Sequence, residues 1–210
     1  MKGTSVRPAA AAGLRERKKA MTRATIEATA LQRFLADGYE RVRLEDLCAD
    51  CLVSTRTFFR YFSSKEDLVL GRLQKHLGVA ADLLAARPAH EPLLTSLREV
   101  IVATVADYSA EPERELARLR LVAMTPPLQS ALARVFAGFD ELIRRFAGAR
   151  EDIQNHSAAK LVAVSAVSAF RIGLEDWVEN DARIDLAGAI LGNLDQLTAG
   201  IAGLGSGVRL

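Results

Sequence analysis

Hydrophobic residues recur along most of the chain at intervals of three and four residues, which is the spacing of one face of an α-helix. Sustained alternation of apolar and polar residues, typical of a half-buried strand, is hard to find. Proline breaks helices; it is absent from residues 9 to 87 and then falls between the periodic segments. The pattern therefore predicts an all-α chain of about nine helices.

Residues that favour helix ends refine these predictions. Gly38 is expected to end the first helix. Ser63 and Glu66 have the spacing of a capping box, which predicts the start of the fourth helix. The apolar face of the first helix is expected to hold Ile26, Ala30, Phe34 and Leu35. The predicted helices span residues 14–36, 44–50, 54–61, 63–86, 93–108, 112–124, 126–148, 157–178 and 185–204.

The composition excludes a mainly disordered chain, because half of the 210 residues are apolar and 26% are charged. Charge is distributed unevenly. The first 75 residues contain 15 Lys and Arg against 9 Asp and Glu, whereas the remainder contains 13 against 17. A basic head on an acidic body indicates a head that meets a polyanion, with a solvated basic face as the alternative.

The N-terminal residues are polar and rich in alanine, without the apolar segment of a signal peptide. The longest apolar stretch, Leu161 to Phe170, is about half as long as a bilayer requires. A soluble, cytoplasmic protein is therefore expected.

Two short predicted helices are joined by a tight turn over residues 50–53, which is the arrangement of a helix-turn-helix. The second helix can lie in the DNA major groove and present its N-terminal side chains to base edges. Arg56 can donate two hydrogen bonds to a guanine, and Thr55 or Thr57 can contact a thymine methyl group or a phosphate. Ser54 opens this helix and is a further candidate for DNA contact.

This helix is also aromatic, with Phe58, Phe59, Tyr61 and Phe62 within five residues. So small a domain cannot bury all four rings, and Phe59 and Tyr61 are expected to point outward. Lys65 follows them and can neutralise a phosphate.

The segment from Gly38 to Leu68 resembles the DNA-binding domain of the TetR family of bacterial transcription regulators. The strongest part of the resemblance is Tyr-Phe-x-x-Lys-Glu-x-Leu at residues 61–68, which follows the second helix at the family's spacing. The resemblance implies that residues 54–61 form the recognition helix, and that Tyr61 and Lys65 lie near the phosphate backbone.

The family's architecture implies a DNA-binding domain over residues 14–63 and a helical ligand-binding and dimerisation domain over 64–204. Tails are expected at 1–13 and 205–210. In the family, the last two long helices of each subunit form a four-helix interface, which implies a homodimer. The candidate interface residues are Phe170, Leu174, Trp177, Leu191 and Leu194.

The middle helices of the second domain are expected to hold an effector pocket. Its candidate residues are Tyr108, Arg118, Phe136 and Phe139, for each of which ordinary core packing is the alternative. The stretch from Leu119 to Pro126 is also similar to a branch of the family with acyl-CoA-like ligands, which favours a lipophilic effector.

Two residues depart from the family's pattern. Leu52 stands in the turn where the family usually has glycine, and a bulky residue in a left-handed conformation is costly, so the turn is expected to open differently. Arg43 stands where threonine often caps the second helix, which loses about 1 kcal/mol of capping and places a cation at the positive end of a helix dipole. A DNA phosphate bound to Arg43 would explain this misfit.

Cys48 and Cys51 have the spacing of a redox pair or of half a metal site, but no second pair or nearby histidine completes a zinc site. Buried packing thiols are favoured, and a thiol switch beside the recognition helix is the alternative. His76, His90 and His156 lie far apart and are expected to have surface or packing roles. The sequence contains neither a nucleophile elbow nor a phosphate-binding glycine loop, so no enzyme, metal or cofactor is expected.

Together these observations predict a homodimeric, ligand-responsive repressor. Its two recognition helices would enter successive major grooves of a pseudo-palindromic operator, and a small effector would release it. One alternative is an all-α enzyme that keeps a degenerate helix-turn-helix. Another is a ligand-binding or scaffold dimer that has lost specific DNA binding.

Overall fold

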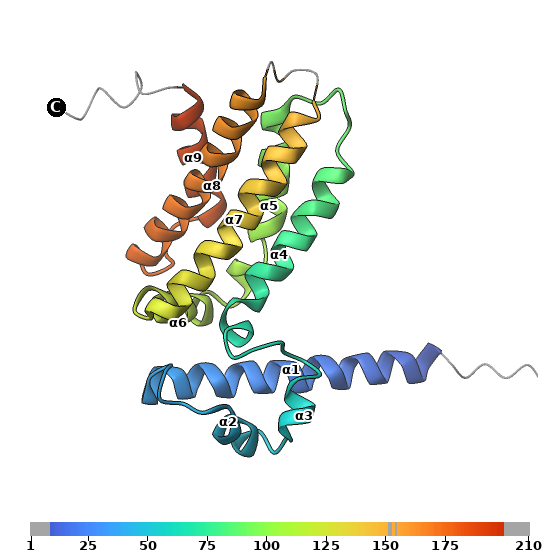
Figure 1. The fold of residues 1–210 in the computed structure, drawn as a ribbon, viewed down its shortest axis with the longest axis vertical. Coiled ribbons are helices and arrows are strands. Elements are labelled where there is room, and N and C mark those ends of the chain that lie inside the picture. Colours follow the sequence, from blue (N-terminus) through green and yellow to red (C-terminus); the bar gives the residue numbers. More distant parts are fainter. Residues whose placement is uncertain (1–8, 151–152, 154, 200–210) are drawn as a thin grey trace, which may run out of the picture. The chain divides into compact units, whose positions relative to one another are not determined.

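The computed structural model describes residues 9–150, 153 and 155–199. In these residues the chain forms nine α-helices and one short 3-10 helix, and it forms no strand (Figure 1). The prediction of an all-α fold is therefore confirmed. The chain divides into two compact units, Met1–Gly71 and Arg72–Leu210, so the division falls later than residue 63, where the sequence places it. The tail expected at 205–210 lies outside the described residues.

The first unit is built around one long helix. The helices with residues in this unit are α1 (Ala9–Asp37), α2 (Leu44–Asp50), α3 (Thr55–Phe58) and the start of α4 (Asp67–Ala85). Residues 9–13 are helical, whereas the sequence assigns them to a tail. Gly38 follows α1 as predicted, with a φ of +88° and its N–H bonded to the Phe34 carbonyl at 3.1 Å.

The buried face of α1 corrects one expectation. Ile26, Ala30 and Phe34 are buried as predicted, but Leu35 is 47% exposed. Successive helical residues differ by about 100° in direction, so Leu35 points away from the face that Phe34 occupies.

The predicted capping box at the start of α4 is wrong, because the helix begins at Asp67 rather than at residue 63. The Ser64 hydroxyl oxygen accepts a bond from the Asp67 N–H at 3.2 Å, and the Asp67 carboxylate accepts one from the Ser63 N–H at 2.8 Å. Ser64 and Asp67 therefore make the capping bonds that the sequence pattern assigns to Ser63 and Glu66.

The second unit contains the remainder of α4 and five further α-helices. They are α5 (Leu93–Val105), α6 (Pro112–Ala123), α7 (Pro126–Gly148), α8 (His156–Glu179) and α9 (Leu186–Ala199). A short 3-10 helix, Tyr108–Ala110, connects α5 to α6. Proline occupies the first position of α6 and of α7, as predicted, because its missing N–H is not needed there.

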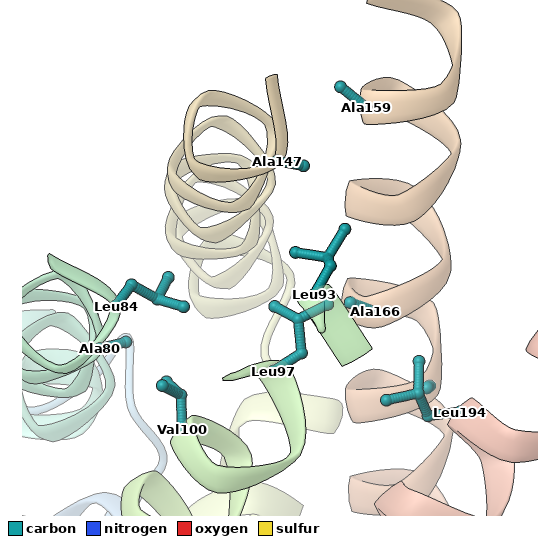
Figure 2. Close-up of a cluster of buried hydrophobic side chains, with 10 residues drawn as sticks. Ala80, Leu84, Leu93, Leu97, Val100, Ala147, Ala159, Ala166 and Leu194 are labelled. Carbon is teal, nitrogen blue, oxygen red and sulfur yellow. The ribbon is translucent and has the colours of Figure 1, made fainter. Parts of the chain in front are cut away.

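The core of this unit is formed where α4, α5, α7 and α8 converge (Figure 2). Side chains of leucine and valine from α4 and α5 meet small residues of α7 and α8. The alanines of α8 let its neighbours approach closely, and the pairs α7–α8 and α8–α9 have the most extensive contacts among the helices. α8 is long and apolar enough to cross a membrane by length and composition alone, and core helices of soluble proteins have the same property.

A buried ionic cluster joins α4 to α6 within the second unit. Glu115 is almost fully buried and pairs with Arg72, whose guanidinium also bonds the carboxylate and the carbonyl of Asp107. Arg72 lies over the Tyr108 ring at 5.3 Å from its centroid. Removing one partner of the Arg72–Glu115 pair would strand a buried charge, so this pair holds α4 against α6.

The closest approach of α8 and α9 generates a stability prediction. A Cβ added at Gly173 would lie 2.5 Å from Cγ1 of Ile190 and 3.0 Å from its Cα. Gly173→Ala is therefore expected to lower the free energy of unfolding by about 1–3 kcal/mol, as overpacking does. Thermal unfolding followed by circular dichroism measures this.

Gly78→Ala is the matched control, because Gly78 is also helical but a Cβ there meets nothing within 4 Å. This change is expected to raise stability by about 0.4–1 kcal/mol. Equal melting temperatures for the two variants would contradict the close helix crossing.

Candidate nucleic-acid interface

The predicted recognition helix is shorter than expected. Regular α-helix covers only Thr55–Phe58, and turns continue to residue 61. Ser54 caps this helix, because its side-chain oxygen accepts a hydrogen bond from the Thr57 N–H at 3.0 Å. So short a helix cannot hold itself together, and side-chain burial has to fix it in place.

Two aromatic rings provide that burial. Phe58 and Phe62 are buried and stack with their centroids 5.2 Å apart. Phe59 is 56% exposed, as predicted. Tyr61 is half-buried, and the guanidinium of Arg60 lies 5.1 Å from the centroid of its ring.

The opposite side of α3 is polar and exposed. Thr55 and Arg56 are exposed, Thr57 is partly exposed, and Arg56 has no ion-pair partner in the described part of the chain. Arg60 is exposed on the same short segment and was not among the predicted DNA contacts. Its signal was present, as a second arginine one helical turn after Arg56.

Lys65 does not point outward as the resemblance implies. Its amino group donates a hydrogen bond to the Tyr39 carbonyl and lies 4.3 Å from the centroid of the Tyr39 ring. It also lies 5.3 Å from the centroid of Phe34. Burial lowers the pKa of Lys65, against the opposing effect of the nearby carboxylates Glu66 and Glu40. In this structure Lys65 joins the end of α1 to the start of α4.

The expectation that the turn opens differently around Leu52 is wrong. Leu52 adopts the left-handed conformation itself, with a φ of +53°, and its side chain is 93% exposed. Its N–H bonds the Ala49 carbonyl at 3.0 Å, and the next N–H, of Val53, bonds the Cys48 carbonyl at 2.9 Å. The turn therefore keeps its shape at a conformational cost of about 1–2 kcal/mol.

Arg43 is the N-cap of α2 and makes no side-chain capping bond, as expected. Its side chain is exposed. Glu45 and Asp46 occupy the first turn of α2, where their negative charges interact favourably with the positive end of the helix dipole. The positive charge of Arg43 interacts unfavourably with the same end.

The two cysteines favour the packing interpretation. Cys48 is buried and Cys51 partly buried, and both are free thiols. Burial raises the pKa of the Cys48 thiol, and the neighbouring Cys51 and Glu45 raise it further. A raised pKa disfavours the reactive thiolate. Among the described residues, no group of three His, Cys, Asp or Glu side chains gathers as a metal site requires.

Comparisons with known proteins decide the family. Residues 26–71 match the model of the bacterial regulatory proteins of the tetR family, and residues 91–202 match the MftR C-terminal domain. The chain belongs to the TetR family. It is thus a DNA-binding transcription regulator, from a family that consists of regulators and not of enzymes.

Relatives in this family cover most of the chain. The protein named TcmR, an HTH-type transcriptional regulator of Streptomyces glaucescens, is 30% identical over 79% of this chain and 76% of its own. The protein named as mycofactocin biosynthesis transcriptional regulator MftR, from Mycobacterium tuberculosis, is 27% identical over 86% of this chain and 96% of its own. The crystal structure of NalD from Pseudomonas aeruginosa shares the fold, with a TM-score of 0.58 and 20% identity over 88% and 97% of the two chains.

The TetR-type second unit contains a partly enclosed apolar cavity of about 50 Å³ between α4, α5, α7 and α8. Phe136 and Phe139 line it, as expected of pocket residues, and so does Phe170, which the sequence analysis assigns to the dimer interface. Thr104 is the one polar residue in the lining, and its hydroxyl already donates to the Val100 carbonyl at 2.6 Å.

Two predicted pocket residues lie elsewhere. Tyr108 is buried against Trp177, with the ring centroids 6.3 Å apart. Arg118 is buried beside Glu115 at 3.5 Å, in the ionic cluster. Both side chains are packed inside the second unit and do not line the cavity.

Three of the residues predicted for the dimer interface are not on the surface of this chain. Leu174, Trp177 and Leu194 are buried inside this chain. α8 is apolar on nearly every side, so periodicity does not reveal which face turns inward. Leu191 is only partly buried.

Arg43 generates a prediction. Arg43→Thr is expected to stabilise the free protein by about 1 kcal/mol, because threonine supplies the missing cap. It is also expected to weaken DNA binding, because a phosphate contact is lost. Thermal unfolding and a fluorescence-anisotropy titration measure the two effects. DNA binding that is equal or tighter would contradict the proposed phosphate contact.

Proposed function

We propose that this TetR-family regulator is a homodimeric repressor, which binds a pseudo-palindromic operator and releases it when a small lipophilic effector binds. The observation that carries the proposal is the division of α3 into a buried aromatic side and an exposed polar side. A repressor needs only to occupy the DNA and block polymerase.

Specific DNA binding is supported by the residues on the exposed side of α3. Thr55, Arg56 and Thr57 are suited to base contacts and Ser54 to a phosphate, while exposed Phe59 can contact a thymine methyl group. Arg43 and Tyr61 are proposed to lie at the phosphate backbone. Lys65 is proposed to stabilise the motif rather than to contact DNA, because its amino group donates a hydrogen bond to the Tyr39 carbonyl.

A homodimer is supported by the outward face of α8. Leu161, Val164 and Ile172 recur at helical spacing, and the first two are 69% and 55% exposed. Such a run of exposed apolar residues is typical of a surface that a partner covers. We place this face in the interface instead of the buried Leu174, Trp177 and Leu194, and we keep Phe170 and Leu191 as peripheral candidates.

The interface is tested by charge. The double variant Leu161→Glu/Val164→Glu is expected to be a monomer, because two buried carboxylates would face their counterparts across the dimer. Light scattering coupled to size exclusion gives the mass. Met21→Glu is the control, because Met21 is a comparably exposed apolar residue in the other unit. A double variant that remains dimeric would contradict this interface.

The lipophilic effector is supported by the apolar cavity. The lining includes Phe136, Phe139 and Phe170, and its one hydroxyl already donates a hydrogen bond within the helix. Such a lining offers no partner to a charged ligand. Because the cavity is small, an effector has to expand it. Binding releases DNA only to the extent that the effector prefers the expanded state. Apolar compounds added to the protein–operator complex should lower its anisotropy, whereas sugars of equal size should not.

The function is tested by anisotropy titration with duplexes that tile the DNA upstream of the protein's own gene, against shuffled duplexes, at about 150 mM salt. Specific binding is expected near 10⁻⁸ M or tighter, and non-specific binding near 10⁻⁴–10⁻⁶ M. One tile bound at least about a thousandfold better than its shuffled copy supports the proposal.

Uniform weak binding to every duplex would instead favour the alternative function, a helical ligand-binding or scaffold dimer that has lost specific DNA binding. The observations that favour this alternative are the strained Leu52 and the uncapped Arg43.

A further inference from the structure

The N-terminal turns of α1 extend beyond the part of the helix that packs. The buried residues of α1 begin at Ile26, whereas every residue from Glu16 to Met21 is exposed. Figure 1 shows this part of α1 running on past α2 and α3. An unpacked helical segment gains little stability of its own in water, so the packing of the unit does not account for it.

The cationic side chains of this extension have no partner among the residues that the structure describes. The side chains of Arg17, Lys18 and Lys19 make no ion pair or hydrogen bond within the described residues. In the packed part of α1, by contrast, Arg23 pairs with Glu27 at 2.9 Å, and Arg33 pairs with two carboxylates. The extension therefore presents positive charge that the protein itself does not use.

One of these cations lies on the side of α1 that faces the recognition segment. Arg23 donates to the Tyr61 carbonyl at 2.7 Å and lies 4.5 Å from the centroid of the Phe62 ring. Lys19 precedes Arg23 by four residues, so it lies on the same face about 6 Å further along the axis. Lys18 and Arg17 precede Arg23 by five and six residues, so at 100° per residue both lie on other sides of the helix.

We infer that the N-terminal extension of α1 is a second DNA contact, in which Lys19 binds a backbone phosphate beside the base pairs that α3 contacts. This inference rests on the DNA binding proposed above. Exposed lysines are suited to the task, since an ammonium group on a flexible stem needs no fixed geometry to meet a phosphate. Such contacts position the protein and carry no sequence information.

The favoured partner is a nucleic acid rather than a membrane surface. A helix that lies on a membrane needs a continuous apolar face opposite its cations. Between Glu16 and Met21 the extension offers only Ala20 and Met21. The adjacent recognition segment supplies a reason for DNA to be close.

The test is the salt dependence of DNA affinity, measured by anisotropy on the operator and on a shuffled duplex. Each phosphate contact contributes about 0.9 to the slope of log K against log salt. Lys19→Gln should therefore reduce the slope by about 0.9 per protomer. The reduction should be the same on both duplexes. Glutamine keeps the helix propensity of lysine, and circular dichroism verifies that helix content is unchanged.

Arg17→Gln is the matched control, because it removes the same charge from the same turn of the opposite face. Its slope should stay within about 0.3 of that of the wild type, well below one phosphate contact. Slopes that are equal for the wild type and the Lys19 variant would overturn the inference, and so would an equal reduction in the Arg17 variant. The salt slope can be measured on the shuffled duplex even if no operator is bound specifically. Failure of this inference is therefore distinct from failure of the proposed function.

Discussion

The DNA-binding unit depends on the burial of Phe58 and Phe62. The helix between Ser54 and Phe59 has a single regular turn, and one turn of helix has no stability in isolation. The stacked rings attach it to the rest of the unit, and Arg23 lies over Phe62 from the side of α1. With one side fixed in this way, the backbone of the polar side is already ordered before DNA binds, which reduces the conformational entropy lost on binding.

The unfavourable features of this unit gather around the same motif. Leu52 takes a left-handed conformation that glycine would adopt freely, and Arg43 leaves α2 without a side-chain cap. Both are exposed residues on either side of the first short helix. Strained backbone and unfavourable charges commonly occur on surfaces that bind a partner. Burial of the aromatic pair offsets their cost in stability.

Much of the fold could be predicted from sequence because it is governed by local rules. Three- and four-residue periodicity gave the helices, and glycine and proline gave several of their ends. The start of α1 was missed because its alanines carry no periodicity. The inward turn of Lys65 was missed because its partner, the Tyr39 carbonyl, is distant in sequence. The buried face of α8 was hidden, since a helix that is apolar all round does not show which neighbours it has.

The same contrast holds for the sites. Sequence identified the exposed residues of α3, because a helix-turn-helix is a local motif with a fixed spacing. It placed only two of four pocket residues at the cavity, Phe136 and Phe139, because a cavity is formed by helices that meet only in three dimensions. Tyr108 and Arg118 are aromatic and cationic like pocket residues, but packing and an ionic cluster use them instead.

The central claim is that Arg56 on the exposed side of α3 contacts a base directly. The most direct measurement is a base-pair substitution scan of the bound duplex with the wild type and with Arg56→Gln. The wild type should discriminate at one G·C pair by about 1–3 kcal/mol, and the variant should lose discrimination at that pair alone. A variant that keeps the full pattern, and is weaker by the same factor on every duplex, would show that Arg56 contacts only the phosphate backbone and would contradict the account.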